Sequence, residues 1–273
     1  MTLLSRTITY VFLFAVAALC LFPLSWVAIT SLKTREEVFA NPYGLPASPN
    51  WDNYVRAWDI GKFSQYTLNS AILSVSTVLL VVGLSLPLGY YIARRRTRLG
   101  GWLFTLFLLG LMVPIHGFMV PLFQNIQALG LLNTQLGTIL AMTATALPFA
   151  VFLMRQAIDE LPDTLFEAAT MDGARPLVTL RLVAMPLLKP TILALGTLQF
   201  IWAWNEFTIP LITLHVEALR PVPVGLTFFS TRFSVDHALT AAGTIIAAAP
   251  LVVVYLVLQR QFVQGILAGA VKG

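Results

Sequence analysis

The segment EAATMDGA, residues 167–174, decides the fold, because it interrupts long apolar runs with two carboxylates, three alanines and a glycine. Pro162 before it suits the first position of a helix, and Gly173 suits the residue at which that helix stops. Pro176 can open a second helix, which Pro186 would limit. The spacing therefore predicts two short helices joined by a tight turn, in a segment that lies off the membrane.

The apolar content of the chain exceeds what a soluble core can bury. Of its 273 residues, 58% are hydrophobic and 11% are charged, and the mean hydropathy is +0.81. A soluble domain carries about 25% charged residues. Lipid is therefore the solvent that these side chains require. The one cysteine, Cys20, excludes an internal disulfide and a cysteine-based metal cluster.

Six apolar stretches are long enough to cross a bilayer, which takes roughly 20 helical residues. They lie near 8–30, 68–93, 102–122, 136–154, 191–213 and 239–258. The first run is too long for a signal peptide, so we expect an uncleaved first span. We predict an all-α membrane protein, a polytopic bundle of six transmembrane helices in a single domain over residues 1–273.

Charge predicts the orientation of this bundle. Six spans put both termini on one side, together with a loop over residues 155–190. Eleven of the 17 basic residues and five of the 12 acidic residues fall on that side, against six of each on the other. Basic residues hold short loops in the cytoplasm, so we predict cytoplasmic termini. The run RRRTR at 94–98 is interpreted as a topology anchor, and without interleaved aromatic residues it indicates no nucleic-acid partner.

Two further segments carry breaker residues. The outer segment 33–66 contains NPYGLPASPNWDNY, which predicts a loop with little regular structure. Within the third span, MVPIHGFMVP at 112–121 holds two prolines and a glycine, which interrupt regular helix bonding. His116 could line a path there, or it could form a hydrogen-bonded helix contact.

The opening segment has the properties of a docking surface. Leu165, Ala168 and Ala169 fall on one face of the predicted helix, and alanine side chains let a partner backbone approach closely. Glu167 and Asp172 can meet basic groups on that partner. The alternative is an ordinary interfacial hairpin that links two spans.

These residues resemble the EAA motif of the membrane subunits of bacterial ABC importers. The match consists of Glu167-Ala168-Ala169, then Gly173 after three residues, then Val183 and Pro186 at the later spacing. The usual ending Ile-x-Leu-Pro reads Val183-Ala184-Met185-Pro186, which keeps its apolar character. The segments TLNSAILS, GLLNTQLGTIL, WNEFTIPLI and QRQFVQGILAGAVKG extend the resemblance, over nearly the whole chain, to carbohydrate permeases of the maltose-transporter MalG type.

The resemblance implies a single ABC-importer transmembrane domain in the bacterial inner membrane. Its coupling helix, which sits in a cleft of a separate ATPase subunit, would contain Glu167, Ala168, Ala169, Asp172 and Gly173. The implied partners are a sister permease subunit, two ATP-binding subunits and an extracytoplasmic solute-binding protein. ATP and Mg²⁺ would bind to the ATPase, and the solute would be an oligosaccharide, a monosaccharide, or a sugar-like phosphodiester or polyol.

The lack of common catalytic sequence patterns agrees with an energy source outside this chain. The chain has no G-x-x-x-x-G-K-[ST] sequence to cradle ATP phosphates, no H-E-x-x-H and no G-x-S-x-G. Its histidines, at 116, 215 and 237, are scattered. We predict no catalytic, cofactor-binding or metal site, and hence no enzyme.

The fifth span contains LQFIWAWNEF, a candidate substrate path. Gln199, Trp202 and Glu206 share a helical face, and Asn205 lies beside it. A charged side chain within a span costs about 2.5–3.5 kcal/mol, so Glu206 should face the bundle interior or water. Aromatic rings with amide groups beside them suit the binding of sugars, which offer apolar ring faces and rims of hydroxyl groups. The alternative is that the Trp residues anchor the membrane interface and Glu206 holds two helices together.

Two other functional classes compete with an ABC importer. A carrier acting alone usually shows several intramembrane ionisable groups, and this chain offers mainly Glu206 and His116. A membrane scaffold would transport nothing. Only the importer predicts a stable complex with a nucleotide-binding subunit, so co-purification separates the three.

Overall fold

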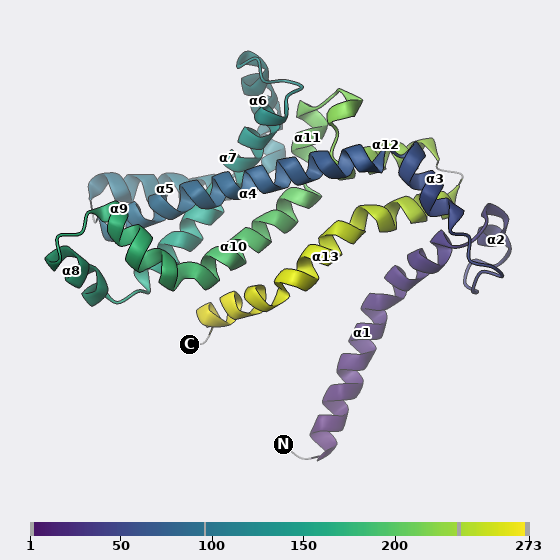
Figure 1. Cartoon of the computed structure of the whole chain (residues 1–273), viewed down its shortest axis with the longest axis horizontal. Helices are drawn as coiled ribbons and strands as arrows, with labels where there is room; N and C mark the ends of the chain where they lie inside the picture. Colours follow the sequence, from purple (N-terminus) through teal and green to yellow (C-terminus); the bar gives the residue numbers. More distant parts are fainter. Residues whose placement is uncertain (1–2, 96, 234–235, 271–273) are drawn as a thin grey trace. The chain divides into compact units, whose positions relative to one another are not determined.

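A computed structural model describes residues 3–95, 97–233 and 236–270 (Figure 1). This described part is helical and contains no β-strand. The chain divides into two compact units, Met1–Thr67 with Gly225–Pro250, and Leu68–Val224 with Leu251–Gly273. The all-α prediction is confirmed.

The first unit contains the long helix α1 (Leu3–Ser31) and two short helices, α2 (Arg35–Ala40) and α3 (Asp52–Ile60). It also holds most of α12 (Val222–Arg232) and the first part of α13 (His237–Ala270). Its core includes Phe63, whose ring contacts that of Phe229 edge to face with 5.6 Å between centroids.

The prediction of little regular structure at 33–66 is wrong for α2 and α3. Thr34 and Glu37 form a capping box, in which each side chain accepts the other residue's backbone N–H. The second Glu37 oxygen accepts the N–H of Ala47 at 3.0 Å. The proline-rich stretch between the two helices, 41–50, is irregular as predicted.

The second unit contains most of the long helix α4 (Phe63–Arg94) and the segments from α5 to η2. These segments are α5 (Arg98–Met112), α6 (Ile115–Ala128), α7 (Gln135–Asp159), α8 (Asp163–Met171), α9 (Pro176–Thr179), the π-helical turn η1 (Leu180–Ala184), α10 (Met185–Asn205), α11 (Thr208–Thr213) and the 3₁₀ turn η2 (Glu217–Leu219). One buried cluster joins α4, α7, α8 and α10 through Leu86, Met154, Phe166 and Leu188.

Four predicted spans coincide with single helices. Residues 8–30 lie in α1, 68–93 in α4, 136–154 in α7 and 239–258 in α13. Within the described residues, five helices are long and apolar enough to cross a membrane, or six if a bent pair forms one span.

The third predicted span, 102–122, is that bent pair and not one straight helix. α5 and α6 meet at an angle of 109° (Figure 1). Val113 and Pro114 join them in extended conformations. Pro114 lacks the N–H that would continue α5, and it disfavours helical geometry at the residue before it.

The fifth predicted span, 191–213, begins earlier than expected and breaks before its end. One helical stretch of 30 residues runs from Pro176 to Asn205, so Pro186 does not limit a short helix. The π-helical turn ends two residues before Pro186 and widens the helix where a proline ring would otherwise clash with an earlier carbonyl. The helix breaks at Glu206, four residues before Pro210. A proline ring clashes with the carbonyl group four residues earlier in a helix, so Pro210 accounts for the break.

Candidate functional site

The predicted turn after α8 is present with full end-capping geometry. Gly173 has φ +74°, and its N–H donates to the carbonyl of Thr170 at 3.0 Å. The N–H of Ala174 donates to the carbonyl of Ala169 at 2.9 Å. This pair of bonds is the Schellman ending that glycine favours. Pro162, expected as the first helical residue, instead precedes the helix as its N-cap.

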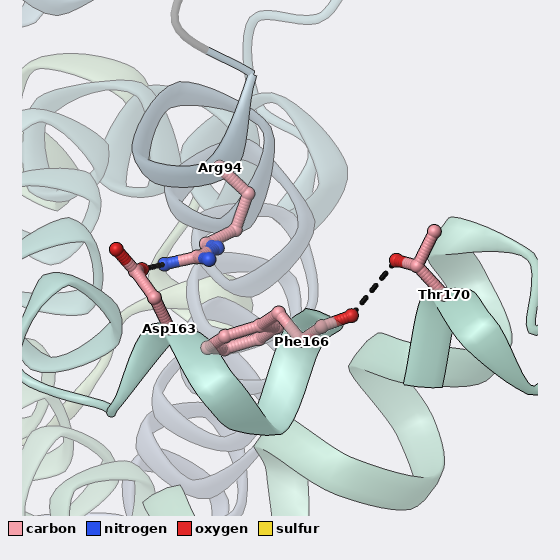
Figure 2. Close-up of polar contacts among 4 residues, drawn as sticks. All are labelled: Arg94, Asp163, Phe166 and Thr170. Carbon is pink, nitrogen blue, oxygen red and sulfur yellow. Dashed lines mark hydrogen bonds and ion pairs between the residues drawn. The ribbon is translucent and has the colours of Figure 1, made fainter. Parts of the chain in front are cut away.

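α8 is fastened to the end of α4 by one arginine, as Figure 2 shows. Arg94 Nη1 lies 2.6 Å from Asp163 Oδ1, in the first turn of α8. The same guanidinium lies over the ring of Phe166, 3.8 Å from its centroid. Phe166 is buried, and Tyr90 approaches its ring from one turn earlier on α4. The helix therefore has a fixed inner face.

The outer face of α8 is left open by this arrangement. Glu167, Ala168 and Asp172 are exposed, and Met171 is 89% exposed. Ala169 points inward with only 8% exposure, so it does not share the exposed face with Ala168 as the sequence spacing suggested. A groove of about 540 Å³ runs along the helix and is lined by Tyr90, Arg94, Phe166, Glu167, Thr170, Met171, Ala174, Pro176 and Thr179.

Arg94 therefore makes a specific contact within the fold, whereas the sequence indicated a topology anchor for the whole run at 94–98. Arg95 is exposed, and Arg96 lies outside the described residues. The sequence held a partial signal for the contact, because Tyr90 and Arg94 are four residues apart and Asp163 and Phe166 three apart, each pair on one helical face. Nothing in the spacing says that these two faces meet.

A second feature is a cavity of about 260 Å³ within the same unit. Helices α4, α6, α7, α10 and α11 surround it. Its lining consists of Thr77, Ile115, Met142, Thr145, Ala146, Phe149, Gln199, Trp202, Ala203, Glu206 and Ile209. Three of the four predicted path residues, Gln199, Trp202 and Glu206, therefore line one cavity. The sequence placed these three on a common face of the fifth span.

Both polar and aromatic groups line this cavity. Gln199 is 1% exposed, and its Nε2 has no hydrogen-bond partner among the described residues. The same holds for the hydroxyl of Thr77. Trp202 is 47% exposed, and its ring meets that of Phe149 edge to face at 5.2 Å. The cavity thus combines an aromatic wall with buried donors.

Glu206 lies in the helix break and not within a helix. Its Oε1 accepts the N–H of Ile209 at 3.0 Å, in the first turn of α11. Sequence reasoning missed this capping role. Asn205 does not line the cavity, because its Nδ2 turns back to the carbonyl of Ile201 at 2.8 Å. His116 is exposed and its neighbour Ile115 lines the cavity instead.

No group of three or more potential metal ligands gathers anywhere in the described part of the chain. The candidate site has two parts. It contains a helix with a fixed inner face and an open outer face, and a cavity with hydrogen-bonding and aromatic walls.

Known proteins share this sequence and fold. Residues 85–268 match the family of binding-protein-dependent transport system inner membrane components. The chain is 33% identical over 270 residues to a Bacillus subtilis protein named "Probable ABC transporter permease protein YurM", covering 99% of this chain and 90% of that one. It is 31% identical to the arabinooligosaccharides transport system permease protein AraQ of Halalkalibacterium halodurans, covering 99% and 98%. It is 29% identical to the diacetylchitobiose uptake system permease protein NgcG of Streptomyces coelicolor, covering 97% and 88%.

A solved structure has the same fold. It is a chain of a bacterial ABC transporter involved in the import of the acidic polysaccharide alginate, with a TM-score of 0.81 and 23% sequence identity over 95% of this chain and 96% of that one. At that identity the likeness supports the fold alone. The sequence match and its apolar helices together show that the chain belongs to the inner-membrane components of binding-protein-dependent transport systems, as a multi-pass ABC transporter permease and not an enzyme.

Proposed function

We propose that the chain forms half of the translocation path of a sugar or oligosaccharide importer. The observation that carries this proposal is the cavity at Gln199, Trp202 and Glu206. Relatives named for arabinooligosaccharides and diacetylchitobiose support the same class of solute. Sugars present apolar ring faces and rims of hydroxyl groups, which match an aromatic wall beside polar side chains.

Each lining group has a distinct role in this proposal. The exposed ring of Trp202 packs against the apolar face of a sugar ring. The unpaired Nε2 of Gln199 donates to a hydroxyl oxygen, and the Glu206 carboxylate accepts from a hydroxyl. A buried donor without a partner costs about 1–3 kcal/mol, which a passing hydroxyl would offset. Asn205 is assigned a lesser part because it turns away from the cavity.

The size of the cavity favours a shared path. Ligand pockets range from about 300 to 1,000 Å³, and the cavity here has about 260 Å³. One chain would therefore enclose only part of an oligosaccharide. We assign the remaining walls to a sister permease subunit, so the complete path would require a heterodimer.

Coupling to ATP is assigned to the open face of α8. Glu167, Ala168 and Asp172 would enter a cleft of an ATPase subunit, while Ala169 and Gly173 shape the helix and its end. Movement of α8 would reach the cavity through Arg94, because α4 also carries Thr77. At 1.5 Å per helical residue, about 26 Å of continuous helix separates those two positions.

The full proposed assembly places the termini and the 155–190 loop in the cytoplasm. It contains this chain, a sister permease, two ATP-binding subunits that hold ATP and Mg²⁺, and an extracytoplasmic solute-binding protein. The chain itself would bind no cofactor and no nucleic acid. The excess of basic residues on the predicted inner side supports this orientation.

One experiment tests the proposal. The complex is purified through this chain, reconstituted in liposomes with ATP inside, and supplied with binding protein loaded with the sugar that mass spectrometry identifies on it. We expect a co-purifying nucleotide-binding subunit, ATP hydrolysis stimulated by the loaded binding protein, and sugar uptake that stops without ATP. Uptake that continues without ATP, or a chain that purifies alone, would overturn it.

A further inference from the structure

A charge-free segment follows the first span. Residues 38–51 read VFANPYGLPASPNW and contain no Asp, Glu, Lys or Arg. Four large apolar or aromatic side chains stand out from it into the surroundings. Their exposed fractions are 64% for Phe39, 81% for Tyr43, 74% for Leu45 and 65% for Trp51. A surface of this kind is unusual for a segment in water, where apolar patches mark a contact.

The segment is held in place by a buried ammonium group. Lys33 is 1% exposed, and its Nζ donates to the carbonyls of Asn41 at 2.7 Å and Pro42 at 3.1 Å. The side chain of Asn41 accepts the N–H of Gly44 at 2.9 Å. These hydrogen bonds hold the turn that presents Tyr43 and Leu45 in one conformation.

The depth of the segment follows from a contact with the first span. Trp26 Nε1 donates to the carbonyl of Pro42 at 3.0 Å. Trp26 precedes the end of α1 at Ser31 by five residues, or about 7.5 Å of helix. The turn thus reaches back alongside the last turns of a membrane span. Trp and Tyr are the residues that occupy this level of a bilayer, between hydrocarbon and water.

We propose that residues 38–51 form an interfacial anchor, which inserts Phe39, Tyr43, Leu45 and Trp51 into the headgroup region of the leaflet at the end of α1. The partner is a lipid surface. The contact between Trp26 and Pro42 favours lipid over a docked protein, because it holds the segment beside the last turns of a membrane span, at the level that Trp and Tyr occupy in a bilayer. The anchor would fix the height and tilt of α1, which interfacial aromatic residues set in membrane helices.

The test removes the single cysteine of this chain, so that a label can be attached to it at one chosen position. In a Cys20→Ser chain, within the whole purified complex in lipid nanodiscs, Leu45→Cys is labelled with an environment-sensitive fluorophore. Glu36→Cys, an exposed position in the first turn of α2 and before the charge-free segment, is the control. Quenching is measured with lipids that carry a spin label near the headgroup, and with iodide in water.

We expect the label at 45 to emit at shorter wavelength, to be quenched by the spin-labelled lipid and to be shielded from iodide. The label at 36 should behave in the opposite way. Free access of iodide to position 45, without lipid quenching, would overturn the anchor. Shielding that appears only after a solute-binding protein is added would overturn it too, because the occupant would then be a protein.

A second variant tests the contact that sets the depth. Trp26→Phe keeps an aromatic ring and removes the donor to Pro42. In this background we expect the label at 45 to lose part of its lipid quenching and to gain iodide access, while the complex keeps its assembly. Unchanged quenching in a correctly assembled complex would contradict the role of Trp26 in placing the segment.

Discussion

Arg94 Nη1 lies 2.6 Å from Asp163 Oδ1, so one ion pair joins the end of α4 to the start of α8 across 69 residues of sequence. Asp163 is well exposed, and such pairs contribute only about 0–1 kcal/mol. The stacking of the guanidinium on Phe166 adds a contribution of similar size. The importance of the contact is therefore geometric: it sets where α8 lies on α4.

Replacing Arg94 by Gln should uncouple the proposed importer and leave it assembled. The change removes both the ion pair and the stacking on Phe166, so α8 would no longer move α4 as one body. The measurement is ATP hydrolysis by the reconstituted complex, with and without loaded binding protein. Arg95→Gln removes an equal charge from an exposed neighbour, so it controls for the effect on membrane insertion. Equal stimulation in both variants would contradict a coupling role for Arg94.

The turn at Gly173 predicts a ranked series of substitutions. A Cβ at this position would meet no atom within 4 Å, so the cost is purely conformational, and φ +74° is the cause. Left-handed geometry costs most residues about 1–2 kcal/mol, and asparagine tolerates it best. We expect loosening of the turn to increase from Gly173 to Asn, then Ala, then Val. Hydrogen exchange of the Ala174 N–H, which donates to the carbonyl of Ala169, measures this loosening, and equal exchange rates for Asn and Val would refute the expected order.

Composition and hydropathy predicted the membrane helices well because apolar length is a property of local sequence. α1, α4, α7 and α13 lie where the apolar runs are. The interrupted third span was also signalled by its prolines. Pro186 misled the prediction, because a π-helical turn lets the helix continue through it. A breaker residue shows that regular bonding is lost, and the surrounding packing decides how the chain responds.

The candidate site was predictable to the extent that it depends on one helical face. Gln199, Trp202 and Glu206 line a common cavity as their spacing suggested. The contacts of Arg94 with α8, and of Thr77 with the cavity, join residues distant in sequence, which no local pattern specifies. Ala169 turned inward because Phe166, a stronger apolar residue, determines the buried face of α8.

The loop around Glu37 should loosen at acid pH. Backbone N–H groups of Thr34 and Ala47 hold the pKa of the Glu37 carboxyl below its usual value. The contribution of the carboxylate is present above its unfolded pKa, about 4.3, and is lost as the pH falls through the lower folded value. The protection of the peptide 34–47 against hydrogen exchange, corrected for the intrinsic effect of pH on the exchange rate, should fall across that range. In Glu37→Gln this change with pH should be absent. If the variant shows the same change, another titratable group causes it.

Trp202 and Trp204 offer a matched pair for testing the sugar path. Trp202 is half exposed at the cavity, whereas Trp204 is buried and stacks on Phe200. Loss of an aromatic contact costs about 0.5–1.5 kcal/mol, so Trp202→Leu should raise the apparent KM for sugar uptake by about two- to tenfold. Trp204→Leu should lower thermal stability and leave the KM of the assembled complexes unchanged. If Trp204→Leu raises the KM and Trp202→Leu lowers only the thermal stability, Trp202 does not line the sugar path.

The last prediction separates two roles of Glu206, which caps α11 and lines the cavity. Glu206→Gln retains an oxygen that can accept the N–H of Ile209, and it removes only the charge. Glu206→Ala removes the acceptor as well, and loss of a capping side chain costs about 0.5–2 kcal/mol. We therefore expect Glu206→Ala to lower the melting temperature of the complex, and Glu206→Gln to leave it nearly unchanged.

Sugar uptake then decides whether Glu206 also contacts the solute. Its charged acceptor would contribute about 1.5–3 kcal/mol to a hydrogen bond with a hydroxyl, and the amide of Glu206→Gln would retain part of that. A raised apparent KM in Glu206→Gln, at an unchanged melting temperature, would support the contact, because the cap is intact in that variant. If the KM of Glu206→Gln equals that of the unmodified complex, and only Glu206→Ala is impaired, Glu206 is a cap for α11 and its substrate role is rejected. Melting temperature and concentration-dependent uptake, measured on the same preparations, supply both readings.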